Sequence, residues 1–317
     1  MAKAKPAIIL GSSLDFIGCE GNGPPYAGAQ TKVGACDPAG IFAPMPFAPS
    51  DRLSSPQNPR IKQVLRLQQK AAERRILGLT LVEGLRELTI AVEAGVPVAT
   101  LYTCPELTGE TGLSTLRHLF ASSPAAPEWF EVTRPVFEKV AYREGSDGLL
   151  AVLRTPARTL ADLRLPPNPL VIVLEAVEKP GNLGAILRTA DAAPVDAVLI
   201  GDPRTDLFNP NVIRASIGCV FTVSTVAAPT ADILAFLREK GIRSYAAALA
   251  PGARTYTECD FRSPTALVMG TEADGLTPQL REACDETIIV PMRGRIESLN
   301  VSVATAVLTF EAVRQRG

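Results

Sequence analysis

The sequence predicts an α/β protein of two domains, the second built on a parallel sheet with helices on both faces. A length of 317 residues favours about two domains. From Leu170 onwards, short apolar runs such as LVIVLEAV and DAVLIGD alternate with stretches of helical periodicity. Strands that are apolar throughout indicate a parallel sheet buried on both faces. The segment ARTLADLRLPPNP, which precedes Leu170, has the composition of a linker.

The first 54 residues differ in composition from the rest of the chain. They are rich in Gly, Pro and Ala, as in GNGPPYAGAQ, and show no sustained periodicity. Such segments do not bury enough apolar surface to offset the entropy of ordering. We therefore predict a disordered extension over residues 1–54.

Residues 55–156 predict a small α/β domain. Its expected elements are a helix over Pro59–Leu77, a strand and helix in LTLVEGLRELTIAVEAG, a strand in VATLYTC, a helix around His118, a strand in EWFEVT, a short helix in PVFEKVAYRE and a strand in GLLAVLRTP. The first helix carries many basic residues against one acid, Glu73. Its charged face is either simply solvated or a surface that contacts nucleic-acid phosphates. The candidate RNA-binding residues there are Arg60, Lys62, Arg66, Lys70, Arg74 and Arg75.

Residues 157–168 are the predicted linker, and residues 169–317 the second domain. Its expected strands are LVIVLEAV, DAVLIGD, VFTVSTV, RSYAAALA, TALVMG and ETIIVPM; its expected helices are NLGAILRTADAA, one starting in NPNVIRASIG, ADILAFLREKG and Val301–Glu311. Folds of this class bind their ligands outside the carboxyl ends of the strands. Candidate site residues are therefore sought where these strands end.

Composition excludes several classes of function. The net charge of −1 gives no global attraction to nucleic acid or membrane, so any basic surface is local. The six cysteines are scattered without a CxxC pair, no secretion signal is visible, and no apolar run approaches the ~20 residues of a membrane span. These features predict a cytoplasmic protein with no membrane partner. The only histidine, His118, lies in a short amphipathic stretch, so we expect neither histidine-based catalysis nor a metal site.

Three segments that follow predicted strands of the second domain carry glycine or polar residues that are candidates for a ligand site. EKPGNLGAILRTADAA places Asn182 at a helix start and Arg188 nearly two turns later; alone, these would be a helix cap and a surface arginine. LVMGTEADGLTP contains Gly270, which lets a ligand approach the backbone or simply forms a turn. IIVPMRGRIESLNVSVATAVLTFE leads from a strand through a polar loop to a helix of small and β-branched residues. No dinucleotide fingerprint or P-loop is present.

Together, NLGAILRTADA, VMGTEADGL and IIVPMRGRIESLNVSVATAVLTFEA resemble the three motifs of the SpoU/TrmH family of RNA ribose 2′-O-methyltransferases, in the SPOUT class, over about residues 165–316. LTLVEGLRELTIAV is similar to the ribosomal-protein-like substrate-binding domain that precedes the catalytic domain in many members. The resemblance implies a trefoil knot in the carboxy-terminal domain, S-adenosylmethionine as cofactor and a homodimer formed through that domain.

The resemblance also implies roles for individual residues. The implied catalytic residues are Asn182, Arg188, Glu272, Ser298 and Asn300. The implied cofactor-binding residues are Met269, Gly270, Gly275, Val290, Pro291, Met292, Leu299 and Asn300, with backbone contacts at Gly270, Val290 and Leu299. A guanidinium keeps its proton up to a pKa above ~12, so it is a poor base. We therefore expect Arg188 to lower the pKa of the ribose hydroxyl electrostatically and to bind an adjacent phosphate, oriented by Glu272.

Some positions depart from the family pattern or stay open. Pro194 replaces a common glycine after the first motif helix, which stiffens that turn. Arg293 and Arg295 stand where members often have small residues; they contact RNA or cap the cofactor pocket. Arg214, in VIRASIG, is a candidate RNA-binding residue or a plain surface residue.

The leading functional hypothesis is a homodimeric RNA 2′-O-methyltransferase that uses S-adenosylmethionine. The extra domain with its basic helix favours ribosomal RNA over transfer RNA as the partner. The alternatives are a transfer RNA methyltransferase, a non-catalytic RNA-binding ribosome assembly factor with the same fold, and a nucleotide-binding α/β enzyme of another kind. The missing phosphate-binding glycine loop argues against the last of these.

Overall fold

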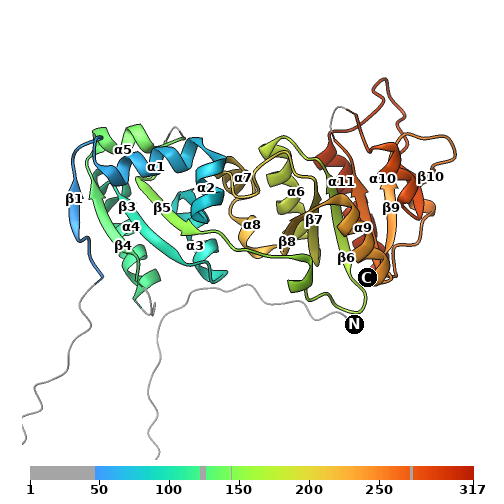
Figure 1. The fold of residues 1–317 in the computed structure, drawn as a ribbon, viewed down its shortest axis with the longest axis horizontal. Coiled ribbons are helices and arrows are strands. Elements are labelled where there is room, and N and C mark those ends of the chain that lie inside the picture. The colour runs from blue at the N-terminus through green and yellow to red at the C-terminus, as the bar shows by residue number, and fades with distance from the viewer. Residues whose placement is uncertain (1–46, 122–125, 144, 272–273) are drawn as a thin grey trace, which may run out of the picture. The chain divides into compact units, whose positions relative to one another are not determined.

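The computed structural model describes residues 47–121, 126–143, 145–271 and 274–317. Residues 47–317 belong to one compact unit that contains two sheets (Figure 1). Almost all of the predicted amino-terminal extension lies outside the described residues.

The first sheet has five strands in the order β1-β4-β3-β5-β2. These are β1 (Asp51–Leu53), β2 (Leu79–Glu83), β3 (Val98–Thr103), β4 (Glu128–Val132) and β5 (Leu149–Arg154). Strand β5 runs antiparallel to β2 and β3, whereas β1 and β3 both pair parallel to β4. Strand β1 precedes residue 55, where the sequence placed the start of this domain, because a three-residue edge strand is too short to show periodicity.

Five helices accompany this sheet: α1 (Pro59–Gln69), α2 (Ala71–Leu77), α3 (Leu85–Glu93), α4 (Pro105–Phe120) and α5 (Arg134–Val140). The predicted helix over Pro59–Leu77 is therefore two helices. Asn58 caps α1 through a bond from the Arg60 backbone N–H, and the chain becomes extended at Lys70, with φ −114° and ψ 108°. This break turns α2 so that Arg74 is buried.

The second sheet has seven strands in the order β10-β12-β9-β11-β6-β7-β8, and all its pairs are parallel. The strands are β6 (Leu170–Glu175), β7 (Ala197–Gly201), β8 (Thr225–Ala228), β9 (Arg243–Ala247), β10 (Arg254–Thr255), β11 (Thr265–Met269) and β12 (Glu286–Ile289). Every residue of β6 is buried, as its apolar run predicted. The predicted parallel sheet is confirmed; the knot stays a prediction.

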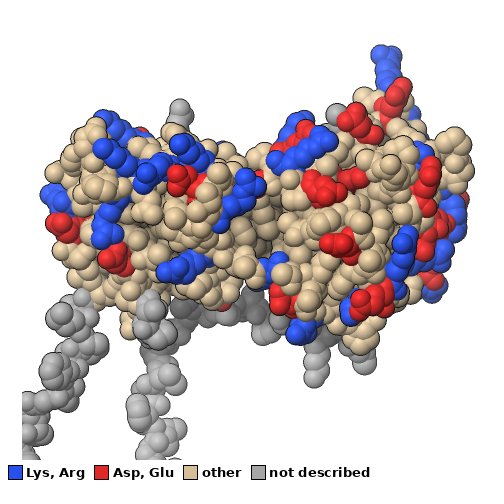
Figure 2. Space-filling model, in the orientation of Figure 1, with Lys and Arg blue, Asp and Glu red and all other residues tan. Residues whose placement is uncertain are grey.

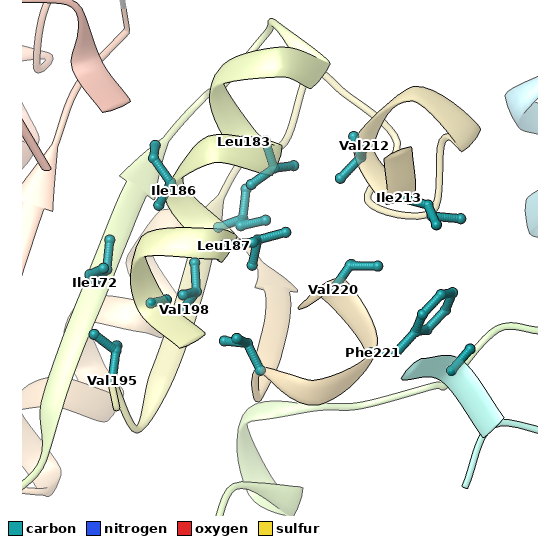
Figure 3. Close-up of a cluster of buried hydrophobic side chains, with 14 of the residues drawn as sticks. Ile172, Leu183, Ile186, Leu187, Val195, Val198, Val212, Ile213, Val220 and Phe221 are labelled. Carbon is teal, nitrogen blue, oxygen red and sulfur yellow. The ribbon is translucent and has the colours of Figure 1, made fainter. Parts of the chain in front are cut away.

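Helices cover both faces of this sheet: α6 (Pro180–Ala192), α7 (Pro210–Ala215), α8 (Cys219–Thr222), α9 (Thr230–Glu239), α10 (Pro278–Ala283) and α11 (Val301–Arg316), with single 3₁₀ turns at Leu160–Asp162 and Tyr256–Glu258. On one face, Leu183, Ile186 and Leu187 of α6 pack among sheet residues such as Val198 (Figure 3). On the other face, α9 contributes Ile233, Phe236 and Leu237 to a separate cluster.

The predicted strand VFTVSTV is only partly a strand. Gly218 adopts φ +83°, a left-handed conformation that favours glycine, and the helical turn α8 follows it. Strand β8 therefore begins at Thr225. Residues Val220 and Phe221, whose β propensity suggested the strand, are instead buried in the core beside α6 (Figure 3).

Candidate active site

A cavity of about 560 Å³ lies at the carboxyl ends of β9, β11 and β12. Its walls include Ala247, Met269 and Ile289, the last residues of these three strands. Seven of the eight predicted cofactor residues line it: Met269, Gly270, Gly275, Val290, Met292, Leu299 and Asn300. The eighth, Pro291, is exposed in the loop after β12. The cavity is thus where parallel α/β sheets bind ligands.

Gly270 is required by the turn that follows β11. The Thr271 N–H donates to the Gly275 carbonyl at 2.9 Å, and the Gly275 N–H donates to the Thr271 carbonyl at 3.2 Å. A Cβ placed on Gly270 would lie 2.1 Å from the Gly275 carbonyl carbon, which no real contact allows. The close approach that the sequence suggested at Gly270 is therefore made by the protein's own backbone. This tight turn shapes one wall of the cavity.

The loop between β12 and α11 forms another wall. Met292, Glu297, Ser298 and Leu299 line the cavity. Among the described residues, no backbone–backbone hydrogen bond involves the segment from Pro291 to Leu299. Its N–H and C=O groups are consequently available to water or to a ligand. Arg293 and Arg295 are exposed on the same loop, which stands out from the domain between β12 and α11 (Figure 1).

Two asparagines meet beside this cavity. The Asn300 side-chain oxygen caps α11 by accepting from the Ser302 N–H at 3.0 Å and the Ser302 hydroxyl at 2.6 Å. The Asn300 amide nitrogen donates to the Asn182 side-chain oxygen at 3.3 Å. Asn182 lies in the first turn of α6, which packs against α11. The first and third motifs are therefore joined through their polar side chains.

Sequence reasoning missed a buried carboxylate, Glu175, that holds the segment after the β11 turn through Thr277. Glu175, the last residue of β6, is only 6% exposed. It accepts from the Thr277 N–H at 2.8 Å and the Thr277 hydroxyl at 2.7 Å. Thr277 in turn caps α10 by accepting from the Leu280 N–H. The available signal was a carboxylate that ends an otherwise apolar strand, LVIVLE.

Of the predicted catalytic residues that the structure describes, Ser298 and Asn300 line the cavity, whereas Asn182 and Arg188 do not. Arg188 is exposed on α6 and does not line the cavity, and no described residue pairs with it in an ion pair or hydrogen bond. Six residues separate it from Asn182, which is about 240° around a helix, so the two side chains point in different directions. Glu272 lies outside the described residues. The described residues hold no group of three or more His, Cys, Asp or Glu suited to a metal ion.

The predicted RNA-binding residues have different surroundings. Lys62, Arg66, Lys70 and Arg75 are exposed, as is Arg214 on α7. Figure 2 shows Lys and Arg side chains gathered over the face that carries α1 and α5. Arg60 pairs with Glu128 at 2.7 Å and stacks over Phe130.

Arg74 is 3% exposed and donates through Nε to Asp206 at 2.6 Å, so it is not free to contact RNA. It also donates to the Leu67 carbonyl at 2.6 Å. Asp206 belongs to the loop after β7, so this buried pair connects the two sheets' domains. Of the predicted RNA-binding residues, Arg74 therefore serves the domain junction instead.

Comparison with known proteins gives matches over both domains. Residues 169–310 match the SpoU rRNA Methylase family, and residues 58–151 match the MRM3-like substrate binding domain. The 23S rRNA (guanosine(2553)-2′-O)-methyltransferase RlmP of Bacillus subtilis is 35% identical over 181 residues, which are 57% of this chain and 71% of that protein. The chain belongs to the SpoU rRNA methylase family.

Solved structures extend the SpoU match to the small domain. A structure described as an RNA 2′-O ribose methyltransferase has 36% identity and a TM-score of 0.71, covering 84% of this chain and 99% of that one. An AdoMet-bound rRNA methyltransferase from Sinorhizobium meliloti has 28% identity and a TM-score of 0.75, covering 83% of this chain and 97% of the other. The resemblance found in the sequence motifs is thereby confirmed.

Proposed function

We propose that this protein transfers a methyl group from S-adenosylmethionine to a ribose 2′-hydroxyl of ribosomal RNA. The observation that carries the proposal is the cavity at the sheet's carboxyl edge, which is built from the second and third motifs and touched by the first through Asn182. SpoU family membership gives this cavity its chemistry. The names of the relatives favour ribosomal over transfer RNA.

The residues of the cavity fit S-adenosylmethionine. A volume of about 560 Å³ is within the range of small-molecule sites. Apolar residues such as Met269, Ile288 and Leu299 suit an adenine ring. The methionine portion of the cofactor carries an ammonium and a carboxylate, and the lining offers both signs of charge in Lys179, Asp274, Arg281 and Glu297. The backbone of residues 291–299, which forms no backbone–backbone hydrogen bond among the described residues, offers further donors and acceptors.

The cofactor, when bound, supplies an activated methyl group, so the protein's tasks are alignment and assistance in losing the hydroxyl proton. Asn182 and Asn300 fix each other beside the cavity, and Ser298 adds a hydroxyl there. The positive charge of Arg188 lowers the pKa of a 2′-hydroxyl brought close to it and attracts the neighbouring phosphate. Glu272 is proposed to orient Arg188.

We further propose a homodimer through the carboxy-terminal domain. Two observations support it. Val303 and Phe310 of α11 are each 49% exposed, so large apolar side chains of this helix face away from the core of their own chain. In addition, Arg188 lies away from the cavity of its own chain. A second copy packed on α11 would cover the apolar residues and bring an arginine from outside to the cavity.

We also propose a separate role for each part of the chain. Residues 55–156 bind substrate RNA, residues 157–168 link the domains, and residues 169–317 carry the knotted catalytic domain. We further propose that the protein acts on ribosomal RNA in the cytoplasm. No helix in the described part of the chain is long and apolar enough to cross a bilayer.

The decisive experiment is transfer of labelled methyl from S-adenosylmethionine to unmodified 23S rRNA, 16S rRNA and bulk transfer RNA. Wild type and Arg188→Ala are compared, with Arg204→Ala as a matched control. Arg204 is also an exposed arginine of this domain, but it pairs with Glu178. Label in a ribosomal RNA that resists alkaline cleavage at one position, and that Arg188→Ala alone abolishes, is the expected result.

Other outcomes would contradict the proposal in distinct ways. Label in transfer RNA alone would change the substrate. Cofactor binding without transfer to any RNA would leave an RNA-binding assembly factor. Failure to bind S-adenosylmethionine would remove the methyltransferase assignment.

A further inference from the structure

Two arginines, one from each domain, lie one helical turn from residues that line a cavity at the junction of the domains. Arg86, on α3 of the small domain, and Arg188, on α6, are both exposed. In the part of the chain that the structure describes, neither makes an ion pair or a hydrogen bond through its side chain. Other basic residues at the junction are engaged: Arg74 pairs with Asp206, and Arg158 donates to the Val223 carbonyl at 3.1 Å.

Helix α3 lies directly against the start of α8. A Cβ on Gly218 would lie 3.2 Å from the Ile90 side chain and 3.3 Å from the Glu87 carbonyl, so little space separates the domains here. Leu88 and Ala91 of α3 belong to the same buried cluster as Val220 and Phe221. The junction is therefore packed, and residues on its rim keep a defined spacing.

Helical geometry then places both arginines on one rim. Ile90 and Asp191, with Cys219, line a cavity of about 440 Å³ between the domains. Arg86 is four residues before Ile90 on α3, and Arg188 is three residues before Asp191 on α6. Residues three or four apart share a helix face. Each arginine therefore lies one turn from a residue that lines this cavity.

The thiol of Cys219 reports the same arrangement independently. Burial and the nearby Asp191 raise its pKa, while the positive charges of Arg188 and Arg86 both lower it. A single side chain is thus within electrostatic reach of both arginines. The acids on this side are Glu93 and Asp191, and Asp191 is occupied by a hydrogen bond from the Thr222 hydroxyl at 2.8 Å.

We propose that Arg86 and Arg188 of one chain bind the same stretch of substrate RNA backbone. Guanidinium groups bind phosphates through paired N–H donors, and two unpaired ones on a shared rim suit adjacent phosphates of one strand. The small domain would then deliver the strand to the catalytic arginine of its own chain. Arg86 is a positioning residue in this scheme. The inference rests on the proposed methyltransferase function and adds an RNA path to it.

A double-mutant cycle on RNA affinity tests the shared contact. The affinity of unmodified 23S rRNA transcript is measured over a series of salt concentrations for wild type, Arg86→Ala, Arg188→Ala and the double variant. Each single change should weaken binding about tenfold and lower the salt slope by about one. The double variant should weaken binding by clearly less than the product of the single effects. Arg117→Ala is the control, because Arg117 is exposed on α4 of the same domain but pairs with Glu110.

Kinetics separate positioning from a merely structural role. Arg86→Ala should raise the KM for RNA about tenfold, leave kcat at saturating RNA unchanged and leave cofactor affinity unchanged. Arg86→Lys should bring the KM and the salt slope part of the way back to their wild-type values. Lysine keeps the positive charge but lacks the paired N–H donors of the guanidinium.

The outcomes that overturn this inference differ from those that overturn the methyltransferase function. An Arg86→Ala variant with the affinity and salt slope of the control, in a wild type that methylates RNA, removes the inference alone. Single effects that multiply fully in the double variant also contradict a shared contact. A wild type that neither binds nor methylates ribosomal RNA removes both.

Discussion

Helix α6 presents two predicted catalytic residues to very different surroundings. At its start, Asn182 contacts Asn300 beside the candidate cofactor cavity. Nearly two turns later, Arg188 is exposed and does not line that cavity. In the proposed site, one chain therefore supplies the cofactor half, which is the lining of this cavity, and its Arg188 lies outside that lining. The difference teaches that the proposed reaction has two separate requirements: a cavity that one chain forms, and an arginine that the proposed second copy would bring to it.

The largest expected effect on methyl transfer comes from removing Arg188. Arg188→Ala should lower kcat by about 10²–10⁴, because the positive charge next to the reacting hydroxyl is lost. Cofactor affinity should stay within about twofold, since Arg188 does not line the cavity. Single-turnover methyl transfer and calorimetric titration with S-adenosylmethionine measure the two quantities. Equal losses in both would show that Arg188 belongs to the cofactor half after all.

The second prediction removes the proposed partner rather than the arginine. Phe310→Asp places a charge on the exposed apolar face of α11, and we expect the dimer to weaken by at least about 2 kcal/mol. Methyl transfer should fall in step with the dimer fraction, while cofactor binding persists in the monomer. Light scattering after gel filtration, together with both assays, checks this.

Ile76→Asp is the matched control for that change, because Ile76 is 81% exposed on the small domain. A fully active Phe310→Asp monomer would show that one chain completes the site without a partner.

The third prediction disturbs the cofactor half alone. In Gly270→Ala the new methyl meets the Gly275 backbone, and overpacking of this kind costs about 1–3 kcal/mol of unfolding free energy. The turn should shift, so that cofactor affinity falls while dimerisation is retained. Gly294→Ala is the control, since a Cβ there meets nothing within 4 Å. Unchanged cofactor affinity in Gly270→Ala would place the bound cofactor away from this turn.

The same comparison shows which features of the fold and the site could be predicted from the sequence. The run LVIVLE predicted a buried strand because each position is apolar until the last, and the structure buries all of it. The resemblance to the three SpoU/TrmH motifs predicted which loops meet at the cavity. The Asn182–Asn300 contact joins residues 118 positions apart, and only the family resemblance brought them together beforehand.

Elsewhere, contacts between residues far apart in the sequence made predictions from local patterns wrong. Arg74 belongs to a basic helical stretch, yet it is buried because Asp206, 132 residues later, pairs with it. Two-residue and three-residue edge strands such as β10 and β1 are too short to show periodicity. The exposed position of Arg188 follows from its place on the helix relative to the buried residues, which the sequence shows. That Arg188 does not line the cavity of its own chain could not be predicted from the sequence.

The smallest expected change in stability lies at the contact between Asn182 and Asn300, which joins the first and third motifs. Asn300→Ala removes both the cap of α11 and the hydrogen bond to Asn182, and losing such a cap costs about 1 kcal/mol. Asn300→Asp keeps the capping oxygen but loses the amide donor. We therefore expect the aspartate variant to unfold at the denaturant concentration of the wild type, yet to lose methyl transfer as the alanine variant does. If Asn300→Asp were fully active, Asn300 would matter for capping α11 and not for methyl transfer. The hydrogen bond from Asn300 to Asn182 of α6 would then not be needed for the reaction.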